Sequence, residues 1–263
     1  MTDATTPTTA AAAKLGFGPV IQGTFGVLKR NFVTYLILIA IFAVVPLAVV
    51  GLGVMQIAGG AVFAGGGLVG AGYLISLASN ALLQASLIHA AVADLNGRKA
   101  TVGECLQTGL RHLLPLLVIL ILYFLGVAFG MIFFLVPGIM IALAWIVAIP
   151  SQVVERTGVF AAFTRSGQLT KNNRWRIFGL VLLWLIVVSV LQGTLTNLTG
   201  VAATVPVDAA SPFAALGPAY WAVMALSTVF NAMIGGAGQA VIYYELRRVK
   251  EGVGPEALAS VFD

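Results

Sequence analysis

Residues 112–154 read HLLPLLVILILYFLGVAFGMIFFLVPGIMIALAWIVAIPSQVV, and no Asp, Glu, Lys or Arg interrupts these 43 positions. A helix rises about 1.5 Å per residue, so a hydrocarbon core of about 30 Å takes about 20 residues to cross. The stretch therefore holds two crossings with almost nothing left over. The chain must reverse in a very short turn, and Pro137 and Gly138 in the Val-Pro-Gly segment 136–138 are the residues expected to form it.

Two longer uncharged stretches flank this one. Between Arg30 and Asp94 lie 63 residues without such a charge, and between Arg176 and Glu245 lie 68, broken only by Asp208. The whole chain of 263 residues is 60% apolar and 9% charged, whereas roughly a quarter of an ordinary soluble domain is charged. We therefore predict an all-α polytopic membrane protein with six transmembrane helices in three hairpins. The expected spans are about 32–54, 68–92, 113–135, 139–154, 177–195 and 219–243.

This arrangement puts every basic residue on one side of the membrane. All 14 Lys and Arg fall there together with eight of the nine acids, which gives that side a net charge of +6. Cations are retained in cytoplasmic loops, so both termini are expected in the cytosol and the protein in the cell (inner) membrane. Residues 1–13 are expected to be a disordered tail without a cleavable signal, 14–250 the membrane domain, and 251–263 a cytosolic tail.

The basic face has two interpretations. Cations beside membrane helices attract anionic headgroups by about 1 kcal/mol each, so the face is expected to contact the phospholipid bilayer and its anionic lipids. The cations could instead serve only to orient the chain, and the sequence leaves both interpretations open.

Each hairpin is preceded by an amphipathic segment, at about 15–29, 102–112 and 158–172. In the third segment Thr157 is expected to cap the helix, while Val159, Phe160, Phe163 and Ser166 fall near one face. Such helices are expected to lie in the membrane interface with their apolar side toward the lipid.

Polar residues recur at helical spacing inside two of the spans. A separation of four places each set on one helical face. Buried amides in lipid need partners, so the two faces are expected to point into the bundle, either as interhelical hydrogen bonds, which we favour, or around a polar cavity. The first set is Ser76, Asn80 and Gln84; the second is Ser227, Asn231, Gly235 and Gln239. Several positions of the two spans match at a constant offset of 151, which suggests that the spans pack in equivalent ways.

Few residues are suited to catalysis or metal binding. Cys105 is the single cysteine, and His89 and His112 are the two histidines. The chain has no H-E-x-x-H motif, no phosphate-binding loop and no paired intramembrane acids. We expect no enzyme activity, no cofactor, no metal and no nucleic-acid partner.

Residues 136–176 carry a recognisable pattern. It consists of a Pro-Gly turn, an aliphatic span with an internal proline that ends in an acid, an Arg-Ser-x-x-Leu helix and a basic edge with tryptophan. Together with YYELRRVKEG at 243–252, this pattern resembles the membrane domain of the glycerophosphoryl diester phosphodiesterase family and its multi-pass relatives. The resemblance implies a membrane module, and no catalytic barrel is expected in the short flanks. The matching residues are Pro137, Gly138, Pro150, Glu155, Arg165, Ser166, Leu169 and Trp175.

Two functions follow as hypotheses. The first is a non-enzymatic membrane module that engages lipid, a membrane-protein partner or a second copy of itself. The alternative is a transporter or flippase-like protein with a polar intramembrane cavity. At the basic face we expect ion pairs between Glu155 and Arg165, and between Glu245 and either Arg247 or Arg248, that hold hairpins to interfacial helices.

Overall fold

The computed structural model describes residues 14–198 and 218–252, which form helices and, within these ranges, no strand. Six helical segments of the described chain are long and apolar enough to cross a membrane, which confirms the all-α polytopic fold in three hairpins. The expected tail 1–13, most of the 196–218 loop and residues 253–263 lie outside the described residues. The helices are α1 (Phe17–Ala58), α2 (Val62–Leu95), α3 (Val102–Phe133), α4 (Leu135–Trp145), α5 (Ala148–Glu155), α6 (Val159–Thr170), α7 (Arg174–Leu198) and α9 (Pro218–Glu251).

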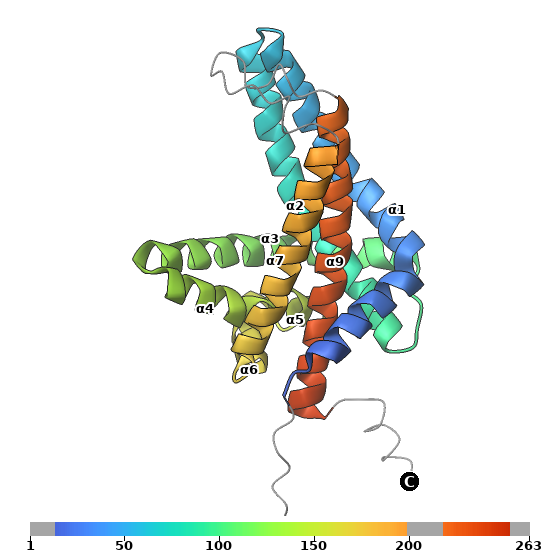
Figure 1. The fold of residues 1–263 in the computed structure, drawn as a ribbon, viewed down its shortest axis with the longest axis vertical. Coiled ribbons are helices and arrows are strands. Elements are labelled where there is room, and N and C mark those ends of the chain that lie inside the picture. Colours follow the sequence, from blue (N-terminus) through green and yellow to red (C-terminus); the bar gives the residue numbers. More distant parts are fainter. Residues whose placement is uncertain (1–13, 199–217, 253–263) are drawn as a thin grey trace, which may run out of the picture.

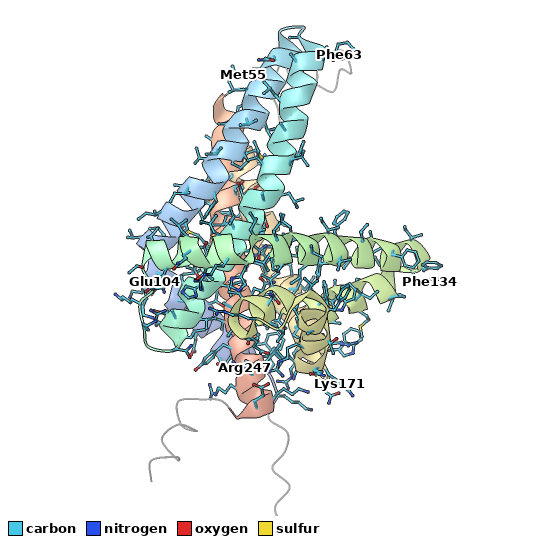
Figure 2. All side chains as sticks on the ribbon, turned by 180° about the vertical axis from the view of Figure 1, so that it is seen from behind. Met55, Phe63, Glu104, Phe134, Lys171 and Arg247 are labelled. Atoms are coloured by element: carbon cyan, nitrogen blue, oxygen red, sulfur yellow. The ribbon has the colours of Figure 1, made fainter. Side chains whose placement is uncertain are left out.

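Four long helices form a column. Helices α1, α2, α7 and α9 run along the length of the molecule, whereas the α3–α4 hairpin projects sideways from it (Figure 1). The beginning of α1 and the end of α9 lie at the same end of the column (Figure 1). Figure 2 shows Arg247 and Lys171 toward that end and Met55 and Phe63 at the other. One end of the molecule is therefore rich in charge and the other apolar.

The α1–α2 hairpin is held by a close approach of two glycines. A Cβ atom added to Gly65 would lie 2.5 Å from the carbonyl oxygen of Gly53, and one added to Gly53 would lie 2.8 Å from the carbonyl oxygen of Gly65. Small residues let membrane helices come this close. Farther along the same pair, the buried hydroxyl of Tyr35 donates to the carbonyl of Leu87 at 3.1 Å.

Two of the expected amphipathic segments are continuous with a span. The first joins its span within α1, where Asn31 interrupts the helix with φ −112° and ψ 15°. The second is the beginning of α3, without a break. Thr101 caps α3 by accepting the backbone N–H of Glu104, while the Glu104 carboxylate accepts the backbone N–H of Thr101. Such reciprocal caps satisfy two backbone donors that a helix start leaves free.

The expected turn at 136–138 is wrong by a few residues. The chain reverses at Phe134, which is extended (φ −160°, ψ 146°), between the end of α3 and the beginning of α4. Pro137 lies in the first turn of α4, where its missing N–H costs no helical hydrogen bond. Gly138 is buried, and a Cβ atom there would lie 2.4 Å from Cγ of Met131. Gly138 therefore provides close packing between the two helices and not the turn itself.

The expected span 139–154 is two helices, because Pro150 cannot donate a hydrogen bond to the carbonyl of Ile146. The break between α4 and α5 falls at residues 146–147. Side chains from other helices satisfy the freed backbone groups, as broken membrane helices require. Gln239 Nε2 donates to the Ile146 carbonyl at 2.6 Å; Ser166 Oγ donates to the Ala144 carbonyl at 2.7 Å and accepts the Val147 N–H at 3.2 Å.

The third amphipathic segment is a separate helix, α6, with two differences from the prediction. Its cap is Gly158 at φ 90°, without a side-chain hydrogen bond, and not Thr157. Phe160 is exposed and lies outside the buried face of α6, which consists of Ala162, Phe163, Ser166, Leu169 and Thr170.

Candidate functional site

A central cavity of about 1310 Å³ lies among the long helices. Its walls come from α1, α2, α3, α7, α9 and the break between α4 and α5. The six polar residues predicted to face the interior all line it. They are Ser76, Asn80 and Gln84 of α2, and Ser227, Asn231 and Gln239 of α9.

The two polar sets do not hydrogen-bond to each other within the described chain. In α2, Ser76 donates to the carbonyl of Gly72 at 2.8 Å, and Gln84 donates to Asn80 Oδ1 at 3.3 Å. In α9, Asn231 donates to the carbonyl of Ser227 at 2.8 Å. Most of these groups bond along their own helix and border a shared space, so the predicted interhelical hydrogen bonds do not run from one polar face to the other.

Two bonds from the α9 set do reach other helices. The Ser227 hydroxyl donates to Gln192 Oε1 of α7. Gln239 satisfies the carbonyl of Ile146 at the α4–α5 break. These bonds fix the position of α9 against two walls of the central cavity while leaving its interior open.

The central cavity opens to the flank of the molecule. Among its lining residues, Tyr73 is 66% exposed and Leu183 is 43% exposed. Helix α7 forms one wall and packs loosely, since Ile177 and Leu180 are its buried residues in the described chain. Because the flanks of membrane helices face lipid, these exposed lining residues lie on the part of the molecule that is expected to contact lipid.

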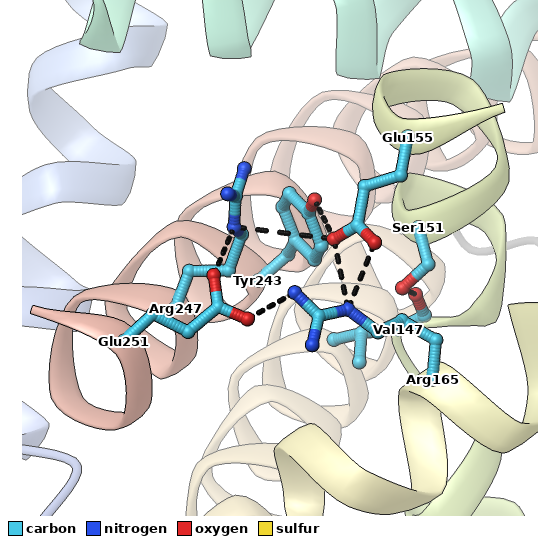
Figure 3. Close-up of polar contacts among 7 residues, drawn as sticks. All are labelled: Val147, Ser151, Glu155, Arg165, Tyr243, Arg247 and Glu251. Carbon is cyan, nitrogen blue, oxygen red and sulfur yellow. Dashed lines mark hydrogen bonds and ion pairs between the residues drawn. The ribbon is translucent and has the colours of Figure 1, made fainter. Parts of the chain in front are cut away.

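A cluster of charged residues ties α9 to the α5–α6 turn at the charged end (Figure 3). We name Glu155, Arg165, Tyr243, Arg247 and Glu251 the C-terminal ion cluster. Arg165 Nε donates to the Glu155 carboxylate at 2.8 Å, and the Tyr243 hydroxyl donates to it at 2.7 Å. Arg165 also donates to Glu251, which pairs with Arg247 at 2.9 Å. These contacts thus connect α5, α6 and α9 through residues up to 96 positions apart.

The C-terminal ion cluster favours the charged form of Arg165. Partial burial would lower the pKa of Arg165, but its hydrogen bonds to Glu155 and Glu251 outweigh that effect and raise the pKa above its ordinary value. Two acids and two arginines make the cluster neutral overall. It is therefore suited to holding helices together and not to attracting an anion.

The other expected pair has a different role. Glu245 pairs with Arg248 at 3.4 Å, three residues away on the same helix, so it does not hold a hairpin to an interfacial helix. Arg247 points toward Glu251 and Glu155 instead. Among the remaining predicted residues, Leu169 and Ser166 are buried, and Trp175 is exposed against Phe178 with ring centroids 6.0 Å apart.

Sequence reasoning missed several residues of both sites. Tyr243 and Glu251 complete the C-terminal ion cluster, and Trp184 and Gln192 of α7 line the central cavity. The third predicted hairpin pairs the spans of α7 and α9, but the sequence does not show which side chains of α7 face the central cavity. The one available signal was the position of Gln192 inside a span that is mostly apolar. Among the described residues, no group of three or more His, Cys, Asp or Glu could hold a metal ion.

Comparison with known proteins supports the membrane assignment. The chain is 32% identical over 112 residues to UPF0259 membrane proteins from Yersinia pestis (strain Pestoides F), Yersinia pseudotuberculosis serotype O:3 (strain YPIII) and Yersinia pseudotuberculosis serotype IB (strain PB1/+). The match covers 43% of this chain and 44% of the length of each relative. No family model matches the chain, and no solved structure does. The chain is therefore a multi-pass membrane protein with homologues among the UPF0259 membrane proteins.

Proposed function

We propose that this protein is a non-enzymatic membrane module that holds a lipid-like molecule in the central cavity. Its basic face would lie against the anionic headgroups of the cytosolic leaflet. The observation that carries the proposal is the central cavity itself. It is lined mainly by apolar side chains, carries a few amides and hydroxyls, and opens toward the region that lipid occupies. Apolar pockets with a few placed polar groups are the usual form of small-molecule sites.

The proposal includes a relationship to the glycerophosphoryl diester phosphodiesterase membrane domain. Its support is the pattern at 136–176 together with the role of Ser166, which satisfies two backbone groups at the α4–α5 break. A serine at this position holds the broken span together. The related module would provide lipid contact and no hydrolysis.

Filling the central cavity tests the proposal. Gly235 lines the cavity, and a Cβ atom added there meets nothing within 4 Å, so Gly235→Leu extends into open space. The substitution should not disturb the helix, because leucine is more favourable than glycine inside a helix by roughly 0.5–1 kcal/mol. Gly70→Leu is the matched control, since Gly70 is exposed on α2, has equally open surroundings and does not line the central cavity.

The measurement is lipid retained by the purified full-length protein, identified by native mass spectrometry. We expect the unsubstituted protein and Gly70→Leu to retain bound lipid and Gly235→Leu to lose it. Equal retention by all three would show that the lipid sits elsewhere on the surface. That outcome would refute the proposed function.

One observation also favours transport as a second function. Ser76 and Asn80 of α2 match Ser227 and Asn231 of α9 at the offset of 151, and all four border the same space. The loosely packed α7 closes one side of it. In liposomes, Asn80→Leu combined with Asn231→Leu should then abolish transbilayer movement of a fluorescent lipid while leaving the fold intact. Movement at the unsubstituted rate would exclude this function.

A further inference from the structure

The segment that leads into α1 is bound to the start of α7. The backbone N–H of Leu15 donates to Asn173 Oδ1 at 3.1 Å, and the Leu15 carbonyl accepts from Arg176 Nη1 at 2.6 Å. Leu15 is fully buried, and a Cβ atom added to Gly179 of α7 would lie 3.0 Å from Cζ of Phe17. We name residues 14–17 the N-terminal strap. The strap joins parts of the chain that lie 158 and 161 positions apart.

The N-terminal strap brings basic residues from two distant segments together. The peptide bond that joins Lys14 to Leu15 lies at the Asn173 side chain, so Lys14 lies beside the α6–α7 turn. Lys14 and Lys171 are exposed, and the latter lies at the charged end of the molecule (Figure 2). Arg174 and Arg176 at the start of α7 are partly buried. We name these four basic residues, Lys14, Lys171, Arg174 and Arg176, the strap cluster.

The strap cluster has no acidic partner within the described chain. All five acids of that part of the chain form ion pairs with other arginines. The pairs are Asp94 with Arg30, Glu104 with Arg98, Glu245 with Arg248, and Glu155 and Glu251 with Arg165 and Arg247. The C-terminal ion cluster is neutral, whereas the strap cluster keeps its positive charge and is suited to attracting an anion.

An exposed tryptophan lies in the middle of the strap cluster. Trp175 stands between Arg174 and Arg176 in the sequence, is 78% exposed and packs edge-on against Phe178. Tryptophan is enriched where the hydrocarbon core meets water, and the predicted span of α7 begins at residue 177, directly after this segment. The anion that the strap cluster meets at this level is therefore a phospholipid headgroup, because basic pockets beside membrane helices on the cytosolic side bind such groups.

We infer that the strap cluster binds the headgroup of an anionic phospholipid of the phosphatidylglycerol type, whose phosphate charge no headgroup amine neutralises. The phosphate oxygens accept hydrogen bonds from the basic side chains, and Trp175 lies among the neighbouring headgroups. At an ionic strength of about 0.1 M, charges more than about 10 Å apart are largely screened, so cations gathered at one place attract a headgroup more strongly than scattered ones. This inference rests on the proposed contact between the basic face and anionic headgroups, and it names the site of that contact.

Native mass spectrometry of the delipidated full-length protein provides the assay. The protein is titrated with dioleoylphosphatidylglycerol or with dioleoylphosphatidylcholine in about 0.1 M ammonium acetate. The acyl chains of the two lipids are identical, so the ratio of the two dissociation constants reports the headgroup and not the central cavity. We expect phosphatidylglycerol to bind about tenfold more tightly.

Two triple variants that lose the same charge locate the site. The strap variant combines Lys14→Gln, Lys171→Gln and Arg174→Gln. The control variant combines Lys29→Gln, Lys99→Gln and Arg111→Gln, which replace exposed cations without an ion pair in the described chain. Both variants keep the bonds of Leu15 to Asn173 and Arg176. We expect the preference for phosphatidylglycerol to fall to about twofold in the strap variant and to stay near tenfold in the control variant.

A pair of single substitutions tests the contribution of the N-terminal strap. Lys14→Gln should weaken phosphatidylglycerol binding about threefold, because the strap holds residue 14 beside the start of α7. Lys29→Gln is the matched control, since residue 29 lies about 18 Å farther along α1 than Phe17. Its affinity for phosphatidylglycerol should not change. Equal affinities for Lys14→Gln and Lys29→Gln would overturn the inference that the strap forms part of the site.

Other outcomes separate this inference from the proposed function. An equal loss of preference in both triple variants, or an unchanged preference in the strap variant, would overturn the inference and leave a general contact of the basic face with anionic lipid. Displacement of phosphatidylglycerol by an equimolar amount of inorganic phosphate would also overturn it, because the site would then bind a free anion. Equal binding of both lipids by the unsubstituted protein would remove the basic face from the proposed function as well, while lipid retention in the central cavity is decided separately by Gly235→Leu.

Discussion

Removing the carboxylate of Glu155 should destabilise the protein by disconnecting α5, α6 and α9. Glu155 accepts the Nε–H of Arg165 at 3.0 and 2.8 Å on its two oxygens and the Tyr243 hydroxyl at 2.7 Å. Glu155→Gln keeps the size of the side chain and one acceptor oxygen but removes the charge. Arg165 and Arg247 would then share Glu251 as their only acid within the C-terminal ion cluster.

The expected magnitude follows from the exposure of the pair. Exposed ion pairs contribute about 0–1 kcal/mol, whereas breaking a fully buried pair costs about 3–5 kcal/mol. The side chains of Glu155 and Arg165 are 17% and 25% exposed, closer to the buried case. We expect Glu155→Gln to lower the free energy of unfolding by about 2 kcal/mol. In a double-mutant cycle with Arg165→Gln, the coupling energy should be about 1.5 kcal/mol.

The unfolding assay uses the single cysteine. Cys105 is fully buried, so a thiol reagent labels it only when the chain opens. Labelling across an SDS titration in mixed micelles gives the free energy of unfolding for each variant. Glu104→Gln is the control, because the Arg98–Glu104 pair is well exposed and glutamine preserves the cap of α3. A coupling energy below about 0.5 kcal/mol, or an equal effect of the control, would refute the reasoning.

Two further predictions concern the α1–α2 hairpin and use the same unfolding assay. Arg30 donates from Nε and Nη2 to Asp94, whose side chain is 5% exposed. Arg30→Gln should therefore lower the free energy of unfolding by about 1 kcal/mol. An unchanged free energy of unfolding would show that the pair contributes nothing. Gly65→Ala should destabilise the protein by about 1–3 kcal/mol, because its Cβ would meet the Gly53 carbonyl. Gly66→Ala is the control and should be neutral or slightly stabilising, because nothing lies near the added Cβ. The reverse order of stabilities would contradict the packing argument.

Part of the candidate site could be predicted from local sequence pattern. The four-residue spacing of Ser76, Asn80 and Gln84 was enough to place them on one helical face, and all three line the central cavity. The pairing of Glu155 with Arg165 was also accessible, since the two lie ten residues apart around a single turn. Glu251 was not, because it lies 86 residues from Arg165 and only the docking of α9 brings them together.

Local prediction failed at two places between α3 and α5. The turn expected at 136–138 falls at Phe134, and the expected span 139–154 is broken in two. A proline shows where a helical hydrogen bond is missing, but not which partner replaces it. At Ile146 the replacement is Gln239, 93 residues away, which also fixes one polar atom at the wall of the central cavity.

Local sequence pattern was enough to predict the fold class and the charged end of this protein, because the transfer of apolar residues out of water and the cost of burying charge act locally along the chain. The role of the polar faces depends instead on how the helices pack in three dimensions. Whether Asn80 and Asn231 bond to each other or border an open space depends on how far apart α2 and α9 are held. That distance is set by packing between the two helices, as where Gly236 of α9 lies close against the side chain of Leu87 of α2.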